Sequence, residues 1–388
     1  MRHCTAMEIS ADICGGSIQV VQVLSKSAVE IALRKDSAAD LKQWFHWKAR
    51  APRGAPAEYR IVNANEAGTP QCWENYQALA SYDRARWFRV PTTFDGRTLV
   101  IRHAPAQKVV YYAYFAAYPM ERHRALVARA EGSRRARVTS VGKSLEQQPI
   151  DVIEVGKVGG PRRKVWIITR QHAGETQGAW LVEGLLGRLL DERDGLADAL
   201  LDRAIFYIVP NMNPDGSARG NFRTNVAGRD LNREWSDPGE QTSPEVACVK
   251  RAMHETGVDL FLDFHGEETA PCAFAIGCEG NPSYSARQRE LERRFCMDLA
   301  SRDRHFWPDY GYGPDDPGKG DLRIGNNFIG EEFDCLSITV ELPFKEGGLH
   351  PVHGGALSFS PDVAMHLGRV SLETIGSVID EVRGENVL

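Results

Sequence analysis

Short apolar runs separated by Gly, Pro, Asn or Asp make up most of the first third of the chain. The runs are rich in β-branched and aromatic residues, the composition typical of β-strands. Many short strands with frequent turn residues favour a sandwich. The pattern therefore predicts an all-β antiparallel sandwich domain over residues 1–125, with strands in ISADI, GSIQVVQVL, AVEIALRK, WFHWKA, EYRIVNA, WFRVPTTF, TLVIRH and KVVYYAYFAAY.

The pattern changes near residue 126, after an expected helix over 119–132. Apolar strands then alternate with stretches long enough for helices. Such alternation is typical of a mixed, mostly parallel sheet with helices on both faces, and it predicts an α/β domain over 126–388. Thr176, Ser243 and Ser360 are expected to cap helices. The main expected elements are the strands VWIIT, IFYIV, DLFLDF and LSITVE and helices over 178–190, 244–255 and 363–382.

Composition and charge narrow the function classes. The chain has 47 basic and 52 acidic residues and no basic block, so we expect no nucleic-acid partner. No stretch reaches the roughly 20 apolar residues of a membrane helix, and the N-terminus lacks an apolar signal core, so we expect a cytoplasmic protein without a membrane partner. The eight cysteines form no CxxC pair and are expected to be free thiols. Composition leaves open whether the protein forms a homo-oligomer.

Residues able to bind a metal follow two of the apolar strands. His172 and Glu175 lie just beyond the run 165–168, and His265 ends the run DLFLDF. The carboxyl ends of strands in an open α/β sheet form the edge where ligands bind. Each histidine alone would more often be structural or solvated, but a catalytic zinc site needs three protein ligands, and these three share one edge. Glu341, at the end of LSITVE, adds a carboxylate there.

A polar loop over 211–235 follows the strand IFYIV and is too polar to be core. A long loop of this kind is more often functional than a simple connection. Arginine suits binding of a carboxylate or polarisation of a carbonyl group. The alternative is a solvated basic loop. Its arginines are Arg219, Arg223, Arg229 and Arg233.

The motifs HAGET, NPDG, GNFRTNVAGRDLNREW, DFHGEE and ITVEL, in this order, resemble the zinc metallocarboxypeptidase family, and within it the cytosolic carboxypeptidases. The resemblance covers about 138–388, and the preceding β part is similar to the N-terminal β-sandwich of bacterial cytosolic carboxypeptidases. It implies one Zn²⁺ per chain, held by His172, Glu175 and His265, the His₂Glu ligand set known for carboxypeptidases. It also implies that Glu341 is the general base and general acid.

The same resemblance assigns the substrate contacts. It implies that Asn232 and Arg233 bind the terminal carboxylate of a peptide, that Arg223 polarises the scissile carbonyl, and that Asp230 orients a zinc-binding histidine. Arg323 falls near the place of a family arginine that binds the C-terminal side chain, although its distance from Glu341 is two residues longer than the family pattern. The alternative for Arg323 is a surface pair with Asp321 or Glu331.

The function predicted is hydrolysis of the C-terminal peptide bond of peptides or proteins, with release of acidic residues, Glu or Asp. Two alternatives are a zinc-dependent deacylase of small N-acyl amino acids and a non-catalytic module that binds C-terminal tails. The family's mobile tyrosine stays unassigned between Tyr310 and Tyr312. The stretch 313–319 fits the start of a GxxxxGK phosphate loop, but Gly320 replaces the required Ser or Thr, so nucleotide binding is not expected.

Overall fold

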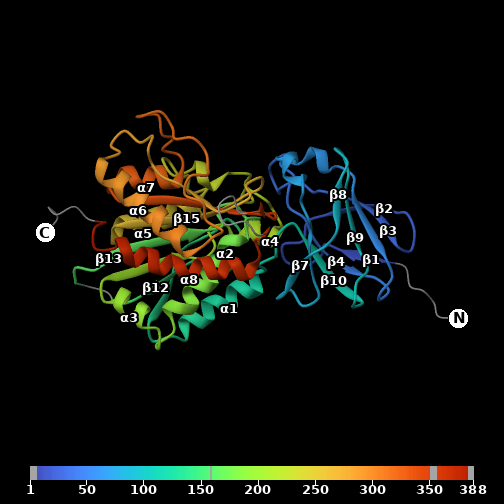
Figure 1. Ribbon diagram of the computed structural model, residues 1–388, viewed down its shortest axis with the longest axis horizontal. Coiled ribbons are helices and arrows are strands. Elements are labelled where there is room, and N and C mark those ends of the chain that lie inside the picture. The colour runs from blue at the N-terminus through green and yellow to red at the C-terminus, as the bar shows by residue number, and fades with distance from the viewer. Residues whose placement is uncertain (1–6, 158–159, 350–355, 383–388) are drawn as a thin grey trace.

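The structure, a computed structural model, describes residues 7–157, 160–349 and 356–382. Figure 1 shows an N-terminal β part beside a larger C-terminal part in which helices surround a sheet. Both parts have the predicted architecture, so the expected fold class is confirmed. The seven described cysteines are free, as expected, and Cys4 lies outside the described residues. None of the described helices combines the length and apolar character needed to span a bilayer.

The N-terminal part consists of two five-stranded sheets, with strand orders β1-β4-β10-β6-β7 and β2-β3-β5-β9-β8. Neighbouring strands are antiparallel except β3 and β5, which run parallel. The run WFRVPTTF forms two strands, one in each sheet, because Pro91 between them cannot donate to a sheet ladder. The strands are β1 (Glu8–Ser10), β2 (Gln19–Val23), β3 (Ala28–Ala32), β4 (His46–Arg50), β5 (Ala57–Ile61), β6 (Leu79–Ser81), β7 (Trp87–Arg89), β8 (Thr92–Phe94), β9 (Leu99–His103) and β10 (Val109–Ala113).

Aromatic side chains hold these two sheets together. Trp47 of β4 and Tyr112 of β10 lie in one sheet, and Tyr59 of β5 lies in the other. Their ring centroids are 4.7 to 5.5 Å apart and all three are fully buried. Aromatic pairs at these distances contribute beyond the area that they bury. Two short 3-10 helices, Ala64–Glu66 and Pro70–Trp73, follow β5.

The C-terminal part is built on a seven-stranded mixed sheet with the order β11-β12-β14-β13-β15-β17-β16. Its four central strands are parallel, and the outer three pair antiparallel. The central strands therefore end at one common edge. The strands are β11 (Ala136–Lys143), β12 (Pro149–Val155), β13 (Arg163–Thr169), β14 (Ala204–Val209), β15 (Leu260–Glu267), β16 (Phe274–Ile276) and β17 (Leu336–Pro343), with a separate pair β18 (Gly348–Leu349) and β19 (Ala356–Leu357).

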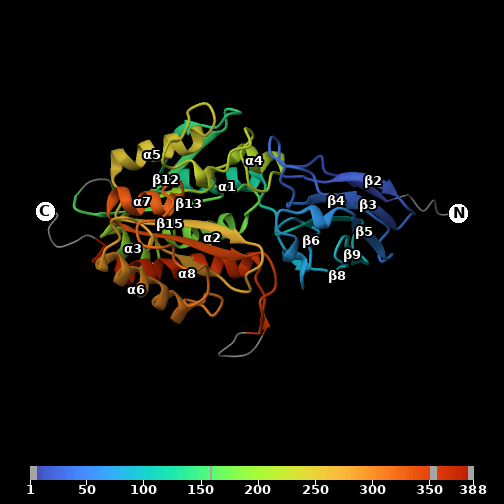
Figure 2. The same cartoon turned by 90° about the horizontal axis from the view of Figure 1, so that it is seen from above.

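Helices cover both faces of this sheet (Figure 2). Val165 and Ile167 of β13 belong to the apolar cluster that includes α2 and α8, whereas Trp166 and Ile168 belong to a second cluster with α5. Burial on both faces explains the continuous apolar run of this strand. The helices are α1 (Met120–Glu131), α2 (Gln177–Leu189), α3 (Gly195–Leu201), α4 (Pro214–Arg219), α5 (Pro244–Thr256), α6 (Ala286–Arg302), α7 (Gly325–Phe333) and α8 (Pro361–Val378), with a 3-10 helix Leu231–Arg233.

The three residues expected to cap helices lie at the helix N-termini, but only one of them forms the expected capping hydrogen bond. The Ser360 hydroxyl accepts a hydrogen bond from Val363 N, as expected. Thr176 instead donates to the carbonyl of Ala116, and Ser243 donates to Glu234. Both hydroxyl groups thus join distant segments rather than cap their own helices.

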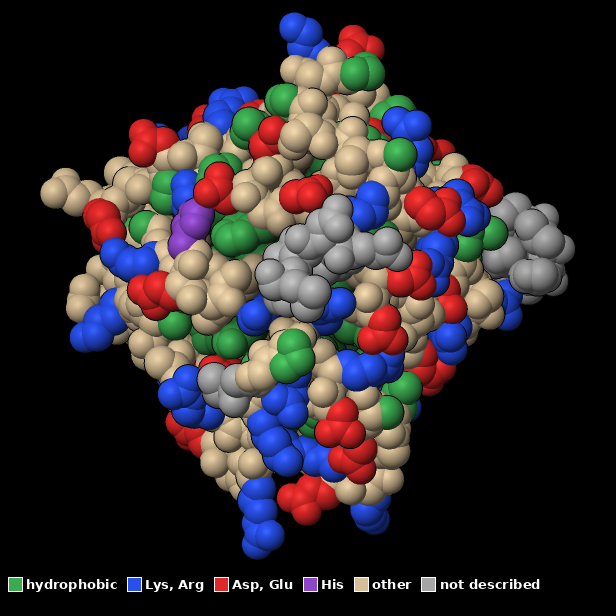
Figure 3. Space-filling model, turned by 90° about the vertical axis from the view of Figure 1, so that its left-hand side faces the viewer, with side chains coloured by type: hydrophobic (Ala, Val, Ile, Leu, Met, Phe, Trp, Pro, Cys, Tyr) green, Lys and Arg blue, Asp and Glu red, His purple; other side chains and the backbone are tan. Residues whose placement is uncertain are grey.

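Helix α1 crosses the predicted domain boundary after residue 125 and packs against β11 and α2. The boundary itself stays a prediction. Figure 3 shows the end of the molecule formed by the C-terminal part, where Lys and Arg side chains are interspersed with Asp and Glu.

Candidate active site

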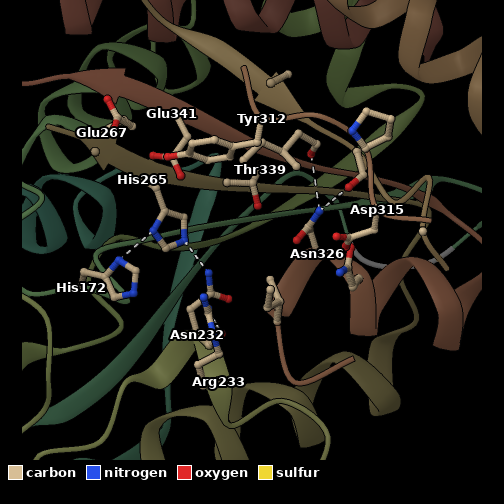
Figure 4. Close-up of a pocket in the computed structure, with 18 of the residues that line it drawn as sticks. His172, Asn232, Arg233, His265, Glu267, Tyr312, Asp315, Asn326, Thr339 and Glu341 are labelled. Atoms are coloured by element: carbon tan, nitrogen blue, oxygen red, sulfur yellow. Dashed lines mark hydrogen bonds between the residues drawn. The ribbon is translucent and has the colours of Figure 1, made fainter. Parts of the chain in front are cut away.

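The ends of β15 and β17, together with the loop that follows β13, line one cavity of about 420 Å³ in the C-terminal part. His265 on β15 and Glu341 on β17 are direct partners in the parallel register, so the sheet itself brings their side chains to the same position. His172 and Glu175 enter from the loop between β13 and α2. Figure 4 shows His172, His265 and Glu341 around this cavity, with Asn232 beside His265 and with Arg233 next to Asn232, on the side away from Glu341. The edge predicted from the strand pattern is therefore the edge at which these residues meet.

His172, Glu175 and His265 form a buried cluster whose ligand atoms all lie within 4.8 Å of one another. Nδ1 of His172 lies 2.7 Å from Oε1 of Glu175, and Nδ1 of His265 lies 2.9 Å from Oε2. The two Nδ1 atoms are 3.2 Å apart. Two imidazole nitrogens and a carboxylate that converge in a buried position are a donor set suited to Zn²⁺. The residues present thus fit the metal that the sequence implied.

Two aspartates hold the outer nitrogens of these histidines. Asp230 lies 3.0 Å from Nε2 of His172, and Asp263 lies 2.9 Å from Nε2 of His265. A carboxylate at the outer nitrogen fixes the ring and leaves Nδ1 with its lone pair toward the metal position. The role implied for Asp230 agrees with this contact. Asp263 was not predicted, although its position two residues before His265 puts both side chains on one face of β15.

The pKa values of two carboxyl groups in the cavity, Glu175 and Glu341, are shifted in opposite directions. Burial would raise the pKa of Glu175, but the adjacent imidazoles of His172 and His265 lower it to about 2. Burial raises the pKa of Glu341 to about 8, with further contributions from Glu175 and Glu268 and an opposing one from His265. Oε2 of Glu341 has no hydrogen-bond partner among the described residues. This carboxyl group is therefore placed to exchange a proton with a molecule in the cavity.

The loop that carries Arg223 packs directly on the loop that carries His172 and Glu175. Gly174 N donates to the carbonyl of Phe222 at 2.6 Å, and a Cβ at Gly174 would lie 2.8 Å from the Phe222 ring. Glycine is therefore required at this position because the two loops approach closely, and not because the backbone adopts an unusual conformation. The Arg223 Nε atom donates to Asp230 at 2.8 Å, so Asp230 bridges Arg223 and His172.

Asn232 and Arg233 line the same cavity. The Asn232 side-chain oxygen accepts from Gly325 N at 2.8 Å, which connects it to the start of α7. Arg233 donates to the carbonyl of Asn232, and no described carboxylate forms an ion pair with it. The guanidinium group of Arg233 is therefore available to a carboxylate in the cavity.

Arg323 is the predicted site residue that the structure does not bring to the cavity. Its guanidinium is bound by Asp321 at 2.7 Å, and its side chain is 62% exposed. Because Asp321 lies only two residues away, the local pair forms without any contact to the cavity wall. The structure therefore shows the alternative that the sequence left open for Arg323, a surface ion pair with Asp321.

The stretch after α6 supplies the outer wall of the cavity. Tyr312 lines the cavity beside Glu341, whereas Tyr310 packs against Phe274 and Trp307. Asp315 also lines the cavity, from the stretch that resembled the start of a phosphate loop. No helix begins within 313–320, as a phosphate loop would require.

Comparison with known proteins identifies the family of the chain. Residues 124–351 match the zinc carboxypeptidase family, and residues 9–115 match the cytosolic carboxypeptidase N-terminal domain. The chain therefore belongs to the zinc carboxypeptidase family. The N-terminal match, together with the structural relatives, assigns it to the cytosolic carboxypeptidase branch that occurs in bacteria.

Three similar proteins illustrate the assignment. A metallo-carboxypeptidase from Burkholderia cenocepacia has a TM-score of 0.92 and 38% identity over 97% of this chain and 100% of its own. A metallo-carboxypeptidase from Pseudomonas aeruginosa, solved with (2-guanidinoethylmercapto)succinic acid, has a TM-score of 0.91 and 40% identity, covering 97% of this chain and 100% of its own. An uncharacterized Zymomonas mobilis protein is 39% identical over 97% of both chains.

Proposed function

We propose that the protein is a zinc-dependent carboxypeptidase that hydrolyses the C-terminal peptide bond of peptides or proteins in the cytoplasm. One observation carries the proposal: three buried metal-binding side chains share a cavity with the unpartnered carboxylate oxygen of Glu341. Membership of the zinc carboxypeptidase family supports the reaction. The match to the cytosolic N-terminal domain supports the location.

In the proposed reaction, the metal and the side chains of the protein have different roles. Zinc held by His172, Glu175 and His265 would lower the pKa of a water molecule to about 7 and polarise the substrate carbonyl. Glu341 accepts the proton of the attacking water and later donates it to the leaving amine. Arg223, fixed by Asp230, offers its remaining guanidinium N–H groups to the carbonyl oxygen as negative charge develops there.

The substrate is held by its free C-terminus. Arg233 has no carboxylate partner among the described residues and presents a planar donor fork that matches a carboxylate. Asn232 lies beside it on the same wall. Binding of the terminal carboxylate here puts the last peptide bond, and no other, next to Glu341 and the metal-binding residues. This arrangement accounts for removal of one residue at a time.

The direct test compares one peptide with a free C-terminus and the same peptide with an amidated C-terminus. We expect the zinc-loaded protein to release the last residue only from the free form. The variant Arg233→Met should raise KM for the free form and retain zinc. Equal cleavage of both forms, or cleavage of an N-acyl amino acid but of no peptide, would replace this proposal with an amidase or a deacylase.

For the residue released, two predictions compete. The sequence predicted acidic residues, and this prediction depended on Arg323, which pairs with Asp321 outside the cavity. The end of the cavity away from the metal cluster is instead lined by Asp315, with Thr339 and Asn326 between it and the cluster. The ligand of the Pseudomonas aeruginosa relative carries a guanidino group on a succinic acid. Both observations favour a cationic side chain, as in C-terminal Lys or Arg.

A peptide series that ends in Lys, Leu or Glu separates the two predictions. An ion pair in this cavity contributes on the order of 1.5 to 3 kcal/mol, so Lys should exceed Leu in kcat/KM by roughly tenfold to a hundredfold. Asp315→Asn should reduce this ratio, while Arg323→Leu should leave it unchanged. Faster cleavage of the Glu peptide, lost in Arg323→Leu, would restore the acidic prediction.

A further inference from the structure

One buried carboxylate of the N-terminal β part contacts the loop that carries Arg223. Asp36 lies in the loop after β3 and is 5% exposed. Its carboxylate accepts hydrogen bonds from Phe222 N at 2.6 Å, Arg223 N at 3.0 Å and Thr224 N at 2.8 Å. The Thr224 hydroxyl adds a fourth bond at 3.0 Å. All four bonds connect positions more than 180 residues apart in the chain.

These bonds converge on the residues that flank and include Arg223. Three consecutive backbone N–H groups that point at one carboxylate fix the path of the chain through 222–224, because each bond restrains a separate peptide unit. On its other side, the same segment accepts the hydrogen bond from Gly174 N of the loop that carries His172 and Glu175. The Arg223 segment is thus held between Asp36 and the metal-binding loop.

Further contacts connect the loop after β3 with the stretch around Arg223. The side-chain oxygen of Asn221 accepts hydrogen bonds from the backbone N–H and the hydroxyl of Ser37. Arg34 donates to the carbonyl of Arg219 at 2.6 Å, and a Cβ at Gly228 would lie 2.5 Å from the Ala38 carbonyl oxygen. The loop from Arg34 to Ala38 therefore fits closely against the stretch that contains Arg223.

We propose that Asp36 is a positioning residue for the proposed carboxypeptidase reaction, and that the N-terminal part acts on catalysis by fixing Arg223 through it. Arg223 joins Asp230, which joins His172, so a displaced Arg223 would lose both its aim at the substrate carbonyl and its contact with Asp230. Displacement of a catalytic group by about 1 Å can cost on the order of a hundredfold in rate. The inference rests on the proposed function, because Arg223 is assigned by it.

The central variant is Asp36→Asn, which keeps the shape of the side chain but turns one acceptor oxygen into an N–H₂ donor that faces the backbone donors. We expect kcat to fall roughly tenfold to a hundredfold with KM changed less than about threefold, because Arg223 acts mainly in the transition state. Zinc content should stay at the wild-type level. The matched control is Asp40→Asn in the same loop, where Asp40 is exposed and pairs with Lys35; its kcat should equal that of wild type.

Two readouts separate positioning from general stability. Hydrogen exchange of the segment 220–226 should become faster in Asp36→Asn, because the amides of 222–224 lose one of their two acceptor oxygens. In the background of Arg223→Lys, Asp36→Asn should lower kcat less than about threefold further, since both variants damage the same group. If Asp36→Asn fails to fold, Thr224→Val, which removes only the hydroxyl donor, should still lower kcat by about twofold to fivefold.

The outcomes are distinct. Wild-type kcat in both Asp36→Asn and Thr224→Val, or losses that multiply in the Arg223→Lys background, would overturn the positioning role. No cleavage of any peptide by the zinc-loaded wild-type protein would instead overturn the proposed function. In that case, hydrogen exchange alone still tests whether Asp36 fixes the Arg223 segment.

Discussion

At the scale of single residues, two glutamates in the same cavity, Glu175 and Glu341, have environments that shift their pKa values differently. Glu175 has a lowered pKa because two imidazoles face it, although burial opposes this, and a permanently ionised carboxylate is what a metal ligand requires. Glu341 has a raised pKa because burial and neighbouring carboxylates disfavour its charge. Two carboxyl groups whose environments shift their pKa values apart mark the ligand and the acid–base group.

Glu341→Gln tests the second of these tasks. The amide cannot accept the proton of water, so we expect kcat to fall by about 10²-fold to 10⁴-fold, the usual contribution of a general base. Metal content should stay at the wild-type level because Glu341 is not one of the three clustered ligands. Steady-state kinetics and metal analysis of the same preparation measure both. Near wild-type turnover would remove Glu341 from the mechanism.

Asp263→Asn tests the support of the metal-binding histidines. Asp263 is fully buried and contacts Nε2 of His265 and the Gln171 side chain. Loss of such a carboxylate weakens metal affinity by about 10-fold to 100-fold. Competition with a chelator measures the zinc dissociation constant. An unchanged constant would show that His265 needs no partner at its outer nitrogen.

The clustering of His172, Glu175 and His265 could be predicted from the sequence because these residues follow strands whose register is fixed by burial. The pairing of His265 with Glu341 then follows from the parallel sheet. The aim of Arg323 could not be predicted, because a flexible surface side chain chooses between several carboxylates at little difference in free energy. Of the alternatives that the sequence left open for this side chain, the structure shows the surface pair with Asp321.

At the scale of elements, glycines determine how α2 and α8 cross. A Cβ at Gly184 of α2 would lie 2.1 Å from the Met365 carbonyl oxygen of α8, and a Cβ at Gly368 would lie 2.1 Å from that of Leu181. The helices therefore approach through their glycines. Gly187, one turn further along α2, is exposed, and a Cβ there would meet no other atom within 4 Å.

The two α2 glycines should respond oppositely to alanine. Gly184→Ala forces the helices apart and should cost about 1 to 3 kcal/mol of unfolding free energy. Gly187→Ala should gain about 0.5 to 1 kcal/mol, since it only lowers the entropy of the unfolded chain. Denaturant unfolding of both variants provides the comparison. A stable Gly184→Ala variant would mean that the α2–α8 contact can relax.

Helix α6 carries a buried carboxyl group that should make stability depend on pH. Burial raises the pKa of Glu292 to about 8, and the neighbouring Glu279 carboxylate adds to this shift. Tyr284 donates to Glu292 at 2.9 Å. Between about pH 4.5 and 8 the folded protein keeps a proton that the unfolded chain releases, so stability falls as pH rises through this window.

Glu292→Gln should remove that loss, because glutamine does not ionise. Its Tm should exceed the wild-type Tm by more at about pH 8 than at about pH 5. The control is Glu290→Gln on the same helix, an exposed residue paired with Arg293 whose lowered pKa predicts no such gain. Parallel Tm profiles for wild type and Glu292→Gln would contradict the raised pKa.

The sequence predicted α2, α5 and α8 because each has a clear apolar stripe or run. Helix α6 was not predicted although its signal is present: Leu291, Phe295 and Leu299 recur at a spacing of four and are buried. Many charged residues around this stripe masked it. Helix α7 has two asparagines and two glycines and owes its helical state to its packing on β15 and β17.

At the scale of the whole molecule, the N-terminal part contributes to the site by contact and not only by proximity. Its architecture could be predicted from short apolar runs, but the bonds from Asp36 to 222–224 could not, because one isolated aspartate in a loop carries no periodic signal. Such long-range contacts depend on how segments far apart in the chain pack together, and residues of both parts belong to one apolar cluster. The fold class was readable from the chain, whereas the contacts between segments far apart in the sequence required the structure.

The most direct test of the account is a zinc titration of protein freed of metal by a chelator. Metal uptake and release of the C-terminal residue from a free-ended peptide are measured in the same samples. We predict that activity rises in proportion to bound zinc and reaches its maximum at about one zinc per chain, and that His265→Ala shows neither uptake nor activity. Full peptide hydrolysis before zinc is added, or full zinc uptake in His265→Ala, would contradict the account.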